Sequence, residues 1–162
     1  MVIKRRKQLK PLSNEHQQAL LAAFQLKKGL AGHGDSAGAP KDLPGLLALA
    51  KRYEATVLIP HTRAEEELLG RFLSAPDHKR LRSEHAELTR LLEAAARGQA
   101  TDVRRALTAF ADLLERHVRW EERELFPSCE KAMDEVDLAK VGHELEKRLV
   151  LSRNDTKTAK RT

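Results

Sequence analysis

The sequence has little of what marks fibrous, disulfide-bonded or membrane proteins. It has one cysteine, Cys129, so no intrachain disulfide can form, and we expect a reducing, cytoplasmic setting. No apolar run approaches the roughly 20 residues that span a bilayer, and the basic start MVIKRRKQLK has no apolar stretch after it. We therefore expect neither a membrane segment nor a secretory signal. Aromatic residues are few among the 162 positions, whereas Leu, Ala, Glu, Lys and Arg are common, which predicts one all-α domain.

The excess of positive charge lies at the two ends of the chain. Residues 1–10 carry five basic side chains, and residues 147–162 carry six against one acidic side chain, so the stretch between is net negative. Binding of nucleic acid would need a basic face with aromatic side chains for stacking, and the ends have none. We expect no nucleic-acid partner and interpret residues 1–12 and 150–162 as a basic tail and a disordered tail.

Apolar residues recur every three or four positions in four long segments, as on one face of a helix. We expect a shorter fifth helix over about 129–149, after four long helices at Ser13–Leu30, Leu43–Leu73, Pro76–Gly98 and Thr101–Pro127. Pro60 should kink the second helix and free a backbone carbonyl one turn earlier. The short connections predict an up-down-up-down four-helix bundle over residues 13–149.

Each of the four apolar stripes contains one histidine, and two of them also contain a glutamate one turn further on. The six polar residues are His16, His61, Glu65, His85, His117 and Glu121. Because buried charged groups need partners, six that converge on one core either pair with each other or bind metal. Histidine and carboxylate are good ligands for iron, manganese, zinc and copper, and side chains at i and i+4 can reach one metal.

An internal repeat supports two equivalent half-sites. Residues 61–66 read HTRAEE and residues 117–122 read HVRWEE, and the partner helices share the shorter echo Glu15-His16 and Glu84-His85. Two helical hairpins related by a pseudo-two-fold axis would each supply two histidines and one shared glutamate. This pattern predicts two metals bridged by two carboxylates. Glu66 and Glu122, which directly follow the glutamates of the stripes, could accept hydrogen bonds from the ligands, but we favour a solvated face for both.

The order of these residues resembles the hemerythrin-like, HHE cation-binding domains, over about residues 13–148. The stretches LIPHTRAEEELL and LLERHVRWEERELFP are similar to the second and fourth helices of that family. The resemblance implies a four-helix bundle around a non-haem di-iron centre, in which Glu65 and Glu121 bridge one iron bound by His16 and His61 and another bound by His85 and His117.

The chain departs from the oxygen-carrier hemerythrins at the third helix, where Leu81 stands in place of a second histidine one turn before His85. One ligand fewer predicts a more open iron that reacts with oxygen, nitric oxide or peroxide instead of carrying oxygen reversibly. Two classes of function stay open: an enzyme (peroxidase, oxidase or nitric oxide reductase), or a metal- or gas-sensing or iron-handling module without turnover. Tyr53, two turns before His61, is expected in the core, where it could line the route to the site.

Overall fold

The computed structural model describes the backbone of residues 6–158 and the side chains of residues 6–149. Every regular element in this part of the chain is a helix, which confirms the all-α prediction. The α-helices are α1 (Lys10–Leu30), α2 (Leu43–Tyr53), α3 (Ile59–Leu69), α4 (Ala75–Arg97), α5 (Ala100–Trp120), α6 (Phe126–Ala132) and α7 (Glu135–Thr158). Shorter 3-10 and π-helical turns are η1 (Lys7–Leu9), η2 (Gly34–Ala37), η3 (Glu54–Leu58), η4 (Gly70–Phe72) and η5 (Glu121–Leu125).

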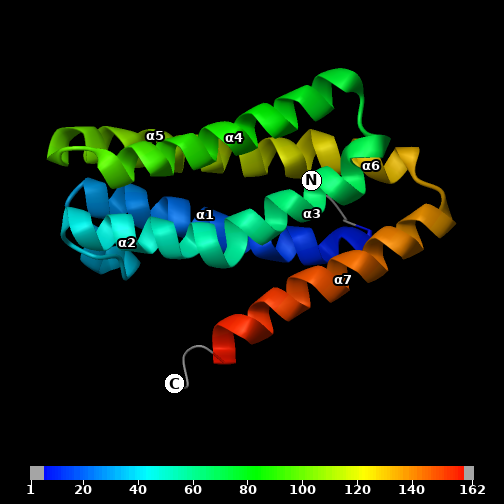
Figure 1. Cartoon of the computed structure of the whole chain (residues 1–162), viewed down its shortest axis with the longest axis horizontal. Helices are drawn as coiled ribbons and strands as arrows, with labels where there is room; N and C mark the ends of the chain where they lie inside the picture. Colours follow the sequence, from blue (N-terminus) through cyan, green and yellow to red (C-terminus); the bar gives the residue numbers. More distant parts are fainter. Residues whose placement is uncertain (1–5, 159–162) are drawn as a thin grey trace.

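The helices form four long rods that lie side by side (Figure 1). They are α1, the pair α2 and α3 joined through η3, α4, and the pair α5 and α6 joined through η5. α5 packs against both α4 and α1, and α7 packs along α3, α1 and η1. Among residues 6–158, no helix is long and apolar enough to cross a membrane.

Side-chain caps fix the start of two rods. Asp42 accepts a hydrogen bond from the backbone N–H of Gly45 at 2.6 Å and begins α2, and Ser74 accepts one from Asp77 at 3.2 Å and begins α4. Two other helix starts differ from the expected residues. α1 begins at Lys10 instead of Ser13, and α5 begins at Ala100 instead of Thr101.

A proline follows a π-helical turn in two of the rods. Pro60 and Pro127 are each the second residue of a helix, directly after η3 and η5. Proline has no N–H to donate to the carbonyl four residues earlier, and its ring pushes that carbonyl away. The wider turn absorbs this, because Ile59 and Phe126 donate to carbonyls five residues back, on Glu54 and Glu121. The fourth rod therefore continues past Pro127, where we expected it to end, to Ala132.

The two ends are more ordered than the sequence predicted. Leu9 and Leu12 fall within the expected tail 1–12, yet both are fully buried in the apolar cluster that α7 covers. The backbone of α7 runs to Thr158, past the expected boundary at 149, so residues 150–158 are helical where we expected disorder. Residues 1–5 and 159–162 of the two expected tails lie outside the described part.

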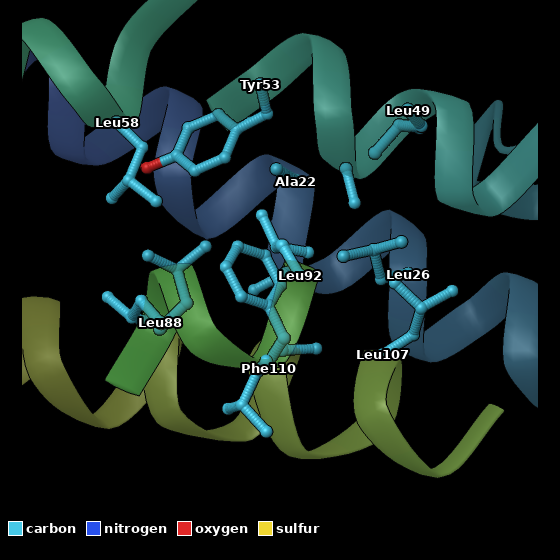
Figure 2. Packing of buried hydrophobic residues seen from close by; sticks show 14 of the residues in the cluster. Ala22, Leu26, Leu49, Tyr53, Leu58, Leu88, Leu92, Leu107 and Phe110 are labelled. Carbon is cyan, nitrogen blue, oxygen red and sulfur yellow. The ribbon is translucent and has the colours of Figure 1, made fainter. Parts of the chain in front are cut away.

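The apolar side chains form two clusters, one toward each end of the rods. The first joins α1, α2, η3, α4 and α5, and Figure 2 shows how its members, among them Leu26, Leu88, Leu92 and Phe110, fill the space between the rods. The second joins η1, α3 and α7 with the opposite ends of α4 and α5, and includes Leu81 and Phe126. The site lies where the two clusters meet.

Candidate metal centre

The six predicted residues form one polar layer between the two apolar clusters. Along α4, for example, His85 stands between Leu81 of the second cluster and Leu88 of the first. All six side chains are buried, and both glutamates are completely inaccessible to solvent. The layer is therefore a dry site, in which an unbalanced charge would be costly.

The layer divides into two groups of four residues, each with its ligand atoms within 4.8 Å of one another. His16 and His61 belong to the first group, His85 and His117 to the second, and Glu65 and Glu121 to both. This geometry could hold one metal ion in each group. The structure thus brings together all six residues that the helical periodicity selected.

Each glutamate gives one oxygen to each group. Oε1 of Glu65 lies 3.2 Å from Nε2 of His61, and its Oε2 lies 3.3 Å from Nε2 of His85. Oε2 of Glu121 lies 3.1 Å from Nε2 of His16, and its Oε1 lies 2.9 Å from Nε2 of His117. Two carboxylates that span two groups in this way have the arrangement of bridging ligands.

Four further glutamates, which sequence reasoning did not assign to the site, contact the outer nitrogens of the histidines. Each Nδ1 lies within 2.9 Å of a carboxylate oxygen, in the pairs His16–Glu122, His61–Glu15, His85–Glu66 and His117–Glu84. The expectation that Glu66 and Glu122 lie on a solvated face is therefore corrected, since both face a histidine and are about one-third exposed. The sequence does contain a sign of these contacts. A glutamate directly precedes His16 and His85, and a second glutamate directly follows Glu65 and Glu121.

These outer contacts fix which nitrogen of each ring carries a proton. An ionised carboxylate only accepts hydrogen bonds, so Nδ1 of each histidine donates and its Nε2 presents a lone pair to the layer. The two Nε2 atoms of each group are 3.1 Å apart. Among the described residues, no hydrogen-bond donor reaches the four oxygens of Glu65 and Glu121. Four nitrogen lone pairs and four carboxylate oxygens thus face each other, and this donor set fits metal cations.

The electrostatics of the layer favour positive charge. Burial by itself lowers the pKa of His85 and of His117, but the neighbouring carboxylates outweigh it and raise these pKa values to about 10 and about 9. Burial raises the pKa of Glu121, yet His117, His16 and His85 hold it well below its usual range. The two Nε2 lone pairs of each group lie only 3.1 Å apart, and one cation between them would satisfy both rings and balance the carboxylates.

A small cavity opens on one side of the layer. The centre of a water-sized molecule can occupy a volume of about 10 Å³ in this cavity, so it has room for roughly one water. Its polar lining includes Glu15, His16, His61, His117 and Glu121, and Tyr53 is part of the same wall. Leu81 is fully buried in the second apolar cluster and does not line this cavity. The cavity touches both histidines of the first group and His117 of the second, but not His85, whereas we expected the more open side at the His85 and His117 group.

Comparison with known proteins gives one finding about family. Residues 75–147 match the family model described as Hemerythrin HHE cation binding domain, which confirms the predicted resemblance. The matched segment holds His85, His117 and Glu121, so it supplies part of both groups. No curated protein and no solved structure matches the chain.

Proposed function

Because residues 75–147 carry the hemerythrin HHE cation-binding sequence, we propose that the chain is a non-haem di-iron protein that binds or reacts with a small ligand. His16 and His61 would hold one iron, His85 and His117 the other, and Glu65 and Glu121 would bridge them. Oxygen, nitric oxide and peroxide are the candidate ligands. The observation that carries the proposal is the set of inward lone pairs and carboxylate oxygens for which the described residues supply no donor.

The arrangement of the rods supports this proposal. We interpret the four rods as an up-down-up-down bundle, in which facing helices project ligands inward from both hairpins. The outer glutamates follow the pseudo-two-fold repeat predicted from the sequence. Glu15 contacts His61 as Glu84 contacts His117. Glu66 contacts His85 as Glu122 contacts His16. An iron pair held in this way would supply redox chemistry to a bound ligand.

The residues of the chain would orient and protect that ligand. The outer glutamates hold the imidazole rings in one tautomer, and a ring contact supports this, since His16 stacks on Phe126 at 5.2 Å between centroids. The apolar clusters on both sides exclude water from the layer. A single cysteine and the small cavity support a reducing, cytoplasmic setting and a ligand of few atoms.

A binding module without turnover is the second candidate. Its support is the small size of the cavity, which leaves no room for an organic substrate beside the layer. In that case occupancy by metal or gas would change the stability of the bundle, and a protein partner would respond to the change. Turnover of peroxide or nitric oxide by the iron-loaded protein would decide for the enzyme.

Metal analysis of protein produced with iron supplied, together with its optical spectrum, tests the di-iron proposal. We expect two irons per chain in the wild type, and a clear loss in His85→Ala. The matched control is His78→Ala, since His78 lies on the same helix α4 but outside both groups. One metal or none in well-folded wild-type protein would contradict the proposal.

A further inference from the structure

Tyr53 is a polar residue that lies in an apolar cluster and also faces the metal layer. It is the chain's only tyrosine, its side chain is buried, and it lines the cavity beside His16, His61 and Glu121. Figure 2 shows the ring at the edge of the first apolar cluster, with its hydroxyl directed toward Leu58 and away from Leu49. The hydroxyl therefore belongs to the cavity side of the ring.

Among residues 6–149, no hydrogen bond joins the Tyr53 hydroxyl to another side chain, and the hydroxyl is not fully enclosed, so it borders the cavity. Buried tyrosines usually place their hydroxyl against an acceptor. Burial raises the pKa of Tyr53, and the carboxylates of Glu121, Glu15 and Glu65 raise it further, so the phenol stays protonated. A protonated, buried phenol without an acceptor of its own can donate to whatever occupies the cavity.

The lining of the cavity restricts what that occupant can be. Apart from the metal-facing side chains and Tyr53, much of the wall is apolar, with Ala19, Leu58, Leu114 and Val118. A molecule that enters therefore shares one small space with the half-site of His16 and His61 and with the Tyr53 phenol. If one of its atoms bound a cation held by that half-site, another atom could accept a hydrogen bond from Tyr53.

We propose that the Tyr53 hydroxyl donates a hydrogen bond to a small anion bound at this side of the layer, and so favours ligands whose outer atom is an acceptor. The inference rests on the proposed di-metal function and adds a ligand-selecting residue to it. A ligand with a strong outer acceptor, such as azide or a hydroperoxide anion, would gain from the contact. A weak acceptor such as nitric oxide would gain little.

The test compares azide binding to the iron-loaded wild type and to Tyr53→Phe, followed by the optical change on titration. Loss of one hydrogen bond to a charged ligand predicts an affinity about tenfold weaker. The matched control is Thr56→Val, which removes a hydroxyl from η3 whose hydrogen bond is internal, to the carbonyl of Arg52 at 2.8 Å. This control should bind azide as the wild type does, and nitric oxide should bind both variants nearly equally.

A second readout does not depend on affinity. Because the chain has a single tyrosine, its ultraviolet resonance Raman doublet reports the hydrogen bonding of Tyr53 alone. We expect the doublet to change toward a donating hydroxyl when azide is added. Equal azide affinity in Tyr53→Phe, or an unchanged doublet on binding, would overturn the role of Tyr53 while leaving the di-iron site intact. Wild-type protein without two irons would instead contradict the proposed function itself.

Discussion

The substitution Glu121→Ala distinguishes two metal groups that share a glutamate from two groups that bind metal independently. Glu121 places one oxygen in each group, 3.1 Å from Nε2 of His16 and 2.9 Å from Nε2 of His117, so its removal takes a ligand from both. Loss of a histidine such as His85 affects only the second group. We therefore expect fewer than one iron per chain in Glu121→Ala but about one in His85→Ala.

The stability of the cation-free protein should also fall in Glu121→Ala. The Glu121 carboxylate is completely buried, and its interactions with His117, His16 and His85 hold its pKa well below the usual range, so it forms part of a buried charged network. Removing one partner of a buried ion pair costs about 3–5 kcal/mol, which for a chain of this size corresponds to a Tm lower by roughly 6–20 °C. Metal at 100 times its Kd stabilises the wild type by a further ~2.7 kcal/mol, which the variant loses.

The assay is metal analysis combined with thermal unfolding, with and without a chelator. Glu124→Ala is the matched control, because Glu124 lies on the same turn η5 but is exposed. It should keep two irons and a wild-type Tm. Two irons in Glu121→Ala, or a Tm within error of the control after chelation, would refute both the shared ligation and the charge balance.

Three further changes test other parts of the structure. Glu84→Gln leaves a poorer acceptor for Nδ1 of His117 and should weaken metal binding about 10–100-fold in a competition assay without unfolding the chain. Leu9→Ala should lower the free energy of unfolding by about 2–5 kcal/mol in urea, whereas a solvated tail would give no change. Lys27 and Arg119 hold the pKa of Glu115 at about 2, below its ordinary 4.5, so this pairing stabilises the fold above pH 4.5 and is lost as pH falls toward 2. In Glu115→Gln, the urea concentration at the midpoint of unfolding should therefore change less with pH between about 2 and 4.5 than it does in the wild type.

Helical periodicity was sufficient to find the six residues of the layer. A histidine among leucines at steps of three and four must face the core, whatever the exact helix ends. The outer glutamates could not be found in the same way, because Glu66 and Glu84 lie beside the apolar stripes of their helices and not within them. Whether such a side chain faces water or a histidine depends on the packing of the neighbouring helix, which a single sequence does not contain.

The helix ends show a similar limit. Leu9 follows a run of basic residues, so composition suggested a tail, and only the packing of α7 over η1 reveals its burial. Pro127 was expected to stop a helix, since proline removes one hydrogen bond of the regular pattern. In the turn η5 the N–H of Phe126 donates to the carbonyl of Glu121, five residues back, so the helix continues through Pro127, and a period of 3.6 gives no sign of this rearrangement.

The position of the polar layer between two apolar clusters has a consequence for how the chain opens. The buried side chains between the two clusters are His and Glu instead of apolar residues, so the two ends share less apolar packing than the members of each cluster share with one another. We therefore expect that, without a cation, the end that contains α7 and the end that contains α2 would open as separate units in amide hydrogen exchange. With a cation in each group, ligands from all four rods would be joined to the same ions, and the two ends should exchange together.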